Sequence, residues 1–108
     1  MVIKILGRDW SLEDVDYEII NGFGAEGGTI AASRRIIISD SLEGDARREV
    51  VIHELLHAIW SETGVGIGLD DFEERIVTAL ALGLSSIVDC NDTATLHDAL
   101  DGLETFLK

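Results

Sequence analysis

Two histidines and a glutamate lie at a spacing that suits metal chemistry. The motif His53-Glu54-x-x-His57 stands within the otherwise apolar run 50–60. Residues four apart lie one above the other on a helix, so His53 and His57 can present two imidazoles to one ion. Glu54 can then reach a water molecule on that ion without ligating the metal. Burying three ionisable groups costs free energy unless they are paired, and a divalent metal would pair them.

A metal-free helix is the alternative interpretation of these residues. Two hydrogen-bonded histidines and a salt-bridged glutamate are compatible with a protein core. The triplet, however, lies in the most apolar helical segment, where chance favours ionisable residues least. The pattern therefore predicts a metal site.

A catalytic zinc usually takes three protein ligands and leaves one position for water. The metzincin extension of the motif needs Gly at position 60 and His at 63, but this chain has Trp60 and Thr63. A deformylase-like site would need an upstream ligating cysteine, whereas the single Cys90 lies downstream. A glutamate from the following helix remains.

Glu73 and Glu74 are the candidates for this third ligand. Both fall in the first turn of a helix that we expect to begin at Asp70 or Asp71. If Asp70 is the N-cap, Glu73 takes the capping-box position and Glu74 is left for the metal. A cap at Asp71 reverses the assignment, so spacing alone leaves both open.

The motif and the segment Glu74–Ala81 together resemble the ImmA/IrrE-type metallopeptidases of phages and mobile elements. The resemblance is greatest to the minimal phage gluzincins, or minigluzincins, and covers residues 2 to about 90. In that family the second-helix glutamate is followed four residues on by a small polar residue, here Thr78, and then by an apolar-Ala pair. Related gluzincins commonly have Asn or Asp at the position of Thr78. The resemblance implies Glu74 as third ligand, one zinc ion per chain and a zincin-like fold.

The expected activity is that of a zinc-dependent endopeptidase. Glu54 would be the general base that activates water against a peptide or protein substrate. Tyr17 and His97 are candidates for a further oxyanion donor by residue type alone. The alternative is a non-catalytic regulatory or binding protein with a structural or vestigial zinc. Glu54 separates the two hypotheses, because a structural site has no use for a general base.

Hydrophobic patterning predicts one α+β domain over residues 1–108. We expect a small, mainly antiparallel sheet packed on two site-bearing helices, with a C-terminal helix behind. The predicted strands cover 2–6, 10–13, 29–31 and 35–39, and the predicted helices cover 40–63, 70–89 and 93–107.

Three more detailed expectations concern these elements. The apolar run Ile36–Ile38 should pack on the histidine-bearing helix, and strand 35–39 could form the sheet edge to which an extended peptide adds. Asp40 and Glu43 have capping-box spacing at the start of that helix. The helix 70–89 is apolar nearly all round from Ile76 onward, which predicts a central position.

The composition limits the kinds of binding partner that we expect. A net charge of -13, from 21 acidic and 8 basic residues, argues against binding nucleic acid and could favour basic partners. A single cysteine and the lack of a long apolar run predict a cytoplasmic protein without a membrane segment. The literal G-x-G-x-x-G at 22–27 is followed by strand-like rather than helix-like sequence, so we expect a turn and no dinucleotide site.

Overall fold

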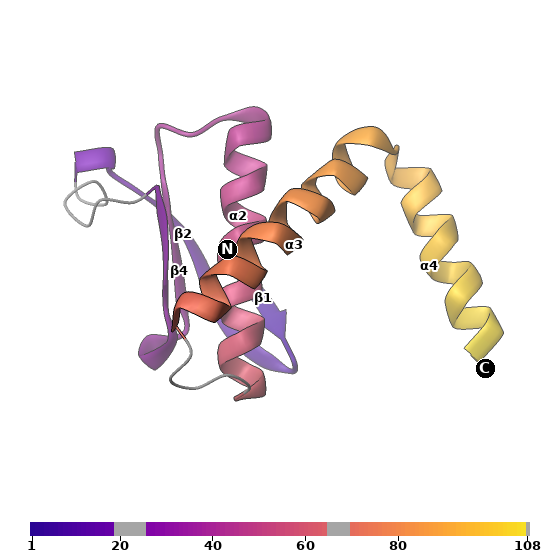
Figure 1. Ribbon diagram of the computed structural model, residues 1–108, viewed down its shortest axis with the longest axis horizontal. Coiled ribbons are helices and arrows are strands. Elements are labelled where there is room, and N and C mark those ends of the chain that lie inside the picture. The colour runs from indigo at the N-terminus through magenta and orange to yellow at the C-terminus, as the bar shows by residue number, and fades with distance from the viewer. Residues whose placement is uncertain (19–25, 65–69, 108) are drawn as a thin grey trace.

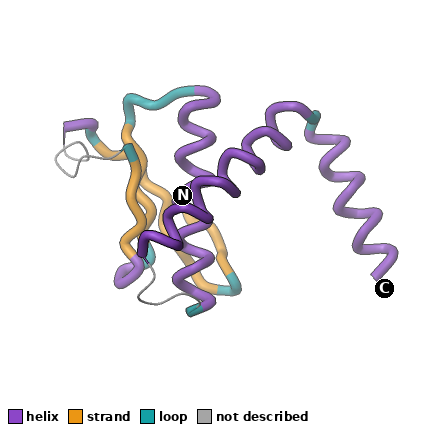
Figure 2. Tube along the Cα trace, in the orientation of Figure 1, coloured by secondary structure: helices purple, strands orange, loops and turns teal. Residues whose placement is uncertain are grey.

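A mixed sheet and two crossing helices form the body of the molecule, which the computed structural model describes over residues 1–18, 26–64 and 70–107 (Figure 1). Figure 2 shows the strands gathered beside the first long helix. The predicted α+β class is confirmed. The elements in chain order are β1 (Val2–Ile5), β2 (Arg8–Val15), β3 (Gly27–Ile30), the short 3-10 helix η1 (Ala31–Ser33), β4 (Arg35–Ser39), α2 (Gly44–Thr63), α3 (Asp70–Cys90) and α4 (Thr93–Leu107).

The strands follow the order β1-β2-β4-β3 across the sheet. β1 and β2 are antiparallel and are joined by Leu6 and Gly7, whose φ angles of 50° and 79° suit a two-residue hairpin turn. β3 and β4 are also antiparallel, whereas β2 and β4 run parallel. Antiparallel pairing therefore predominates among the described strands, as predicted, with a parallel pair at the centre.

Strand 35–39, for which the sequence left a position at the sheet edge open, lies inside the sheet. β4 has β2 on one side and β3 on the other. Ile36 and Ile38 are fully buried, as is typical of a strand covered by neighbours. The edge alternative is therefore wrong, because β2 pairs with β4 in parallel. β3 is the edge strand on that side of the described sheet.

Helix α2 begins at Gly44 rather than at Asp40. Glu43 precedes it in extended backbone, with φ -137°. The predicted capping box does not form, because Glu43 rather than Asp40 is the N-cap residue. Asp40 Oδ1 instead accepts a hydrogen bond from the backbone N–H of Tyr17 (3.2 Å). The helix ends as predicted at Gly64, which adopts the left-handed conformation with φ 69°.

The main hydrophobic core lies between α2 and the sheet. Val51 and Leu55 of α2 pack against buried side chains of the strands. The prediction that the run Ile36–Ile38 packs on this helix is thereby confirmed. The buried residues of this cluster are Ile5, Trp10, Ile36, Ile38 and Ala58.

Glu62 links the last turn of α2 to the sheet. Its Oε1 accepts hydrogen bonds from Trp10 Nε1 (2.9 Å) and Arg34 Nε (2.7 Å). Its Oε2 lies 3.3 Å from Arg8 Nε. The hydrogen bond from Arg34 is the main cause of a lowered pKa at Glu62, and the bond from Trp10 adds to it. These contacts fix the orientation of α2 on the strands.

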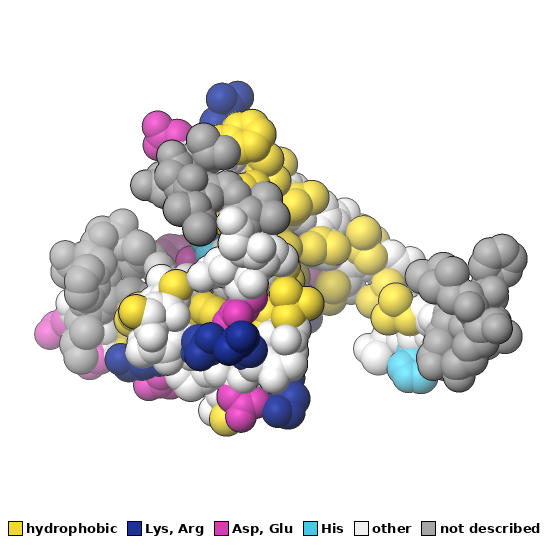
Figure 3. Space-filling model, turned by 90° about the horizontal axis from the view of Figure 1, so that it is seen from below, with side chains coloured by type: hydrophobic (Ala, Val, Ile, Leu, Met, Phe, Trp, Pro, Cys, Tyr) yellow, Lys and Arg dark blue, Asp and Glu magenta, His cyan; other side chains and the backbone are white. Residues whose placement is uncertain are grey.

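Helix α3 crosses α2 and buries only one of its faces. Val77, Ala81 and Ser85 recur every four residues and are buried. Figure 3 shows hydrophobic side chains on the surface of the part of α3 that extends beyond the body. The predicted central position is therefore wrong, since many of its large apolar side chains are exposed, namely Phe72, Leu80, Leu82, Leu84, Ile87 and Val88.

Helix α4 extends from the end of α3 away from the sheet and α2 (Figure 1). Its predicted start at Thr93 is confirmed, because Asp92 Oδ1 accepts a hydrogen bond from the backbone N–H of Thr95 (2.7 Å). The expectation that α4 lies behind the helical core is wrong. None of the described helices combines the length and apolarity needed to cross a membrane.

Candidate metal centre

Helix α2 presents both histidines of the motif on the same side. The ring centroids of His53 and His57 are 4.9 Å apart, with an angle of 62° between the ring planes. Their Nε2 atoms are 3.2 Å apart. The rings are partly buried, with 25% and 16% of the side chains exposed. The spacing of four residues thus brings two nitrogen donors to one point.

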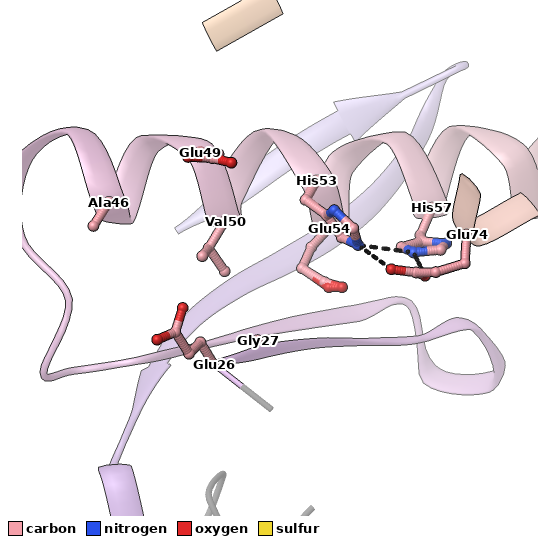
Figure 4. Close-up of a pocket in the computed structure, with 9 residues that line it drawn as sticks. All are labelled: Glu26, Gly27, Ala46, Glu49, Val50, His53, Glu54, His57 and Glu74. Carbon is pink, nitrogen blue, oxygen red and sulfur yellow. Dashed lines mark hydrogen bonds and ion pairs between the residues drawn. The ribbon is translucent and has the colours of Figure 1, made fainter. Parts of the chain in front are cut away.

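Glu74 of α3 reaches both of these nitrogens. Its Oε1 lies 3.0 Å from His53 Nε2, and its Oε2 lies 2.8 Å from His57 Nε2. The dashed lines in Figure 4 follow these contacts. Donor atoms of the three residues all lie within 4.8 Å of one another. The crossing of α2 and α3 therefore brings together the two histidines and the glutamate that the sequence suggested as ligands.

Glu73 contacts the opposite side of one imidazole. Its Oε2 forms a short hydrogen bond with His57 Nδ1. A carboxylate on Nδ1 holds the proton there and leaves Nε2 free to bind a metal. The two glutamates that spacing could not separate therefore contact different nitrogens of His57. Only Glu74 contacts the Nε2 atoms of both His53 and His57.

Glu54 lies beside this cluster and is 6% exposed. Its Oε2 is buried and has no hydrogen-bond partner among the described residues. Burial raises the pKa of the Glu54 carboxyl, against the opposing charges of His57 and His53. An unpartnered buried carboxylate oxygen is costly, so this oxygen is open to a hydrogen bond from a water molecule or a ligand in the cavity.

The start of β3, with Gly27 and the preceding Glu26, forms the wall opposite α2. The cavity between them has a volume of about 460 Å³. Thr29 Oγ1 donates a hydrogen bond to the backbone carbonyl of Glu54 (3.1 Å), which ties the edge strand to the helix. At Gly27 a Cβ would lie 2.7 Å from Val50 Cγ1 and 3.2 Å from Glu54 Cγ. Glycine is therefore required for β3 to approach α2 this closely.

The donor set fits a zinc ion. Two imidazole nitrogens and one carboxylate are a common ligand set of catalytic zinc, with a fourth position left for water. Donors of a tetrahedral zinc with bonds near 2.05 Å lie about 3.3 Å apart. The two Nε2 atoms are 3.2 Å apart, close to this value, and each lies 2.8–3.0 Å from one oxygen of the Glu74 carboxylate.

Three other residues singled out from the sequence, Tyr17, Cys90 and His97, lie outside the cavity. Tyr17 and His97 do not line it, and His97 is exposed on α4, where it pairs with Asp101 (3.0 Å). Neither position supports a role as oxyanion donor. Cys90 is exposed at the end of α3. In the glycine-rich motif 22–27, Glu26 and Gly27 line the cavity and Gly27 begins β3, while residues 22–25 lie outside the described part of the chain.

Sequence reasoning missed two carboxylates of the cavity, Glu26 and Glu49. Glu49 precedes His53 by four residues, so helical periodicity alone could have placed it on the same face. Glu26 stands just before the edge strand, and no local pattern indicated that β3 faces α2. Comparisons with protein-family models, curated proteins and solved structures found no match to this chain.

Proposed function

We propose that this chain is a zinc-dependent endopeptidase in which His53, His57 and Glu74 hold the metal. One observation carries the proposal. Three donor atoms from two helices meet in a cavity beside a buried carboxylate, Glu54, that has an unpartnered oxygen. A structural zinc site is usually closed by four protein ligands, whereas three donors and an adjacent proton acceptor suit hydrolysis.

Zinc, when bound, supplies a Lewis acid that makes water acidic near neutral pH and polarises a carbonyl. Glu54 accepts the proton of the attacking water and passes it to the amine that leaves. Glu73 forms a hydrogen bond with Nδ1 of His57, and this contact keeps Nε2 of that ring directed at the site. The cavity between α2 and β3 receives the peptide, and its volume of about 460 Å³ accommodates a few side chains at a time.

The resemblance to the minimal phage gluzincins supports this proposal. The family order of a histidine helix followed by a glutamate helix agrees with α2 and α3. A zincin-like architecture and a peptide or protein substrate are parts of the same proposal. A cytoplasmic setting also belongs to it and rests on the single cysteine.

The proposal is tested by incubating the zinc-loaded chain with casein and with mixed synthetic peptides, and by counting new amino termini. Glu54→Gln should bind zinc as the wild type does and lose at least about 100-fold in cleavage rate. Glu18→Gln, at an exposed position outside the cavity, is the matched control and should cleave normally.

Two outcomes would contradict the assignment. Cleavage that persists in Glu54→Gln would show that another group is the base. A wild-type chain that binds zinc but releases no new amino termini would exclude the peptidase and favour a regulatory zinc protein.

A further inference from the structure

We propose that one end of the cavity is a subsite for a lysine or arginine side chain of a bound peptide. This subsite is formed by Glu26, Ala46, Glu49 and Val50, and lies at the end away from Glu74 (Figure 4). The inference deepens the proposed peptidase and rests on it for the identity of the ligand as a peptide. The substrate class that follows is a basic peptide segment.

The charge of the cavity is uniformly negative apart from the histidines. Four carboxylates line it, those of Glu26, Glu49, Glu54 and Glu74, and none of its lining residues is a lysine or arginine. Glu26 and Glu49 are exposed and form no ion pair within the described part of the chain. Two like charges facing one cavity lower their repulsion when a cation lies between them.

The nearest arginines along the chain do not supply that cation. Arg47 and Arg48 fall between Ala46 and Glu49 in sequence, but both point to other partners. Arg47 pairs with Asp14 (2.5 Å), and Arg48 pairs with Asp89 at the far end of α3. The basic side chains of α2 are thus engaged elsewhere, and the carboxylates of the cavity are left for a ligand.

An apolar strip accompanies these charges. Ala46 and Val50 are four residues apart on α2 and both line the cavity. Figure 4 shows the Glu26 side chain directed toward the helix beside Val50. A lysine or arginine carries an apolar stem and a charged tip. The stem would pack along Ala46 and Val50, and the tip would reach Glu26 and Glu49.

Glu54, on which the proposed function also rests, lies at the other end of the same cavity. It is 6% exposed, lies against the cavity, and keeps a carboxylate oxygen without a partner among the described residues. A buried acceptor of this kind is costly unless something occupies the cavity. The acidic rim is therefore part of a built cavity and differs from scattered surface acids.

Peptide binding tests this inference without requiring turnover. The protein is zinc-loaded, full-length Glu54→Gln. The probes are two synthetic octapeptide libraries with blocked ends, which share random neutral positions and differ only in a fixed lysine or Nε-acetyl-lysine. We expect the lysine library to bind about five- to tenfold more tightly. The preference should shrink in 0.5 M salt, because exposed charges are screened.

Charge-matched variants separate the subsite from the net charge of -13. Adding Glu26→Gln and Glu49→Gln to Glu54→Gln should abolish the preference for lysine. Adding Glu18→Gln and Asp98→Asn, which removes two exposed acids outside the cavity, should preserve it. Equal binding of the two libraries, no binding of either, or an equal effect of both variant pairs would overturn the inference.

Cleavage by the zinc-loaded wild type separates this inference from the proposed function. If the wild type cleaves both libraries at the same rate, the peptidase is supported and the basic subsite is wrong. If the lysine library binds selectively but the wild type cleaves neither library, the subsite is supported and the peptidase is wrong.

Discussion

His57 is the residue on which the candidate centre depends most. Its two ring nitrogens have different partners, with Nε2 at Glu74 (2.8 Å) and Nδ1 at Glu73. A carboxylate on the outer nitrogen fixes the tautomer and orients the inner nitrogen, as is common for histidine ligands of metals. Adjacent glutamates in one helical turn thus take two different roles. Glu74 contacts the Nε2 atoms of His53 and His57, and Glu73 orients the ring of His57.

These roles predict unequal effects on zinc affinity. Glu74→Ala removes a ligand and should weaken zinc binding by at least about 100-fold, whereas Glu73→Ala removes an orienting contact and should weaken it by about tenfold. Competition for zinc between each variant and a chelating dye measures both affinities. Each variant is the control for the other, because both remove one glutamate from the same helical turn. The reverse order would move the third ligand to Glu73.

The sequence predicted part of this centre. The spacing of His53, Glu54 and His57 specified one helix face, because four residues make about one turn. It could not distinguish Glu73 from Glu74, since neighbouring helical positions point about 100° apart. The choice between them depends on the angle at which α3 crosses α2, which local patterns do not encode.

At the scale of elements, the close approach of β3 to α2 shapes the cavity. A Cβ at Gly27 would lie 2.7 Å from Val50 Cγ1, whereas at Gly28 the nearest atom would be Ile37 Cγ1 at an ordinary 3.5 Å. Gly27→Ala should therefore lower the free energy of unfolding by about 1–3 kcal/mol, and Gly28→Ala should change it little. Urea unfolding of both variants tests this, and equal losses would mean that the contact does not constrain the strand.

Glu62 should make stability depend on pH. Chiefly because of the hydrogen bond from Arg34, the pKa of Glu62 is lower in the folded chain than its usual value of 4.5. A carboxyl with a lowered pKa contributes stability above its unfolded pKa and loses that contribution as the pH falls through the folded pKa. The difference in unfolding free energy between wild type and Glu62→Gln should therefore be greatest at pH 7. It should begin to shrink below about pH 4.5 and disappear as the pH falls through the folded pKa.

Urea unfolding across this pH range, with a chelator to exclude metal effects, measures that difference. Asp98→Asn, which removes an exposed carboxylate of α4, is the control. A difference for Glu62→Gln that stays constant from pH 7 to pH 3 would contradict a stabilising role for the Arg34 contact.

The elements themselves were largely predictable from the sequence. Alternation and turn residues located the strands, and Gly64 marked the end of α2. The start of α2 and the edge of the sheet were not predictable, because both depend on distant contacts. Tyr17 engages Asp40, and β2 pairs in parallel with β4 across an intervening stretch of chain.

At the scale of the whole molecule, zinc would join α3 to α2. Helix α3 packs mainly on α2, and its described part buries only Val77, Ala81 and Ser85. Its apolar sequence suggested a central place, but too few other elements exist to cover it. A ligand that binds the folded state alone adds about 2.7 kcal/mol at 100 times its dissociation constant.

That free energy predicts a thermal shift. Zinc at 100 times its dissociation constant should raise the melting temperature of the wild type by about 10–20 °C. His53→Ala, measured under the same conditions, should lack most of this shift. Equal shifts in the two proteins would show that zinc binds elsewhere.

The most direct test is an anomalous difference map at the zinc absorption edge, from crystals grown with one equivalent of zinc. We predict one peak about 2.0–2.2 Å from His53 Nε2, His57 Nε2 and a carboxylate oxygen of Glu74. Glu54 should lie nearby without ligating the ion. A map with no peak between the two imidazoles, or with a peak held by other residues, would contradict the metal centre and the hydrolase built on it.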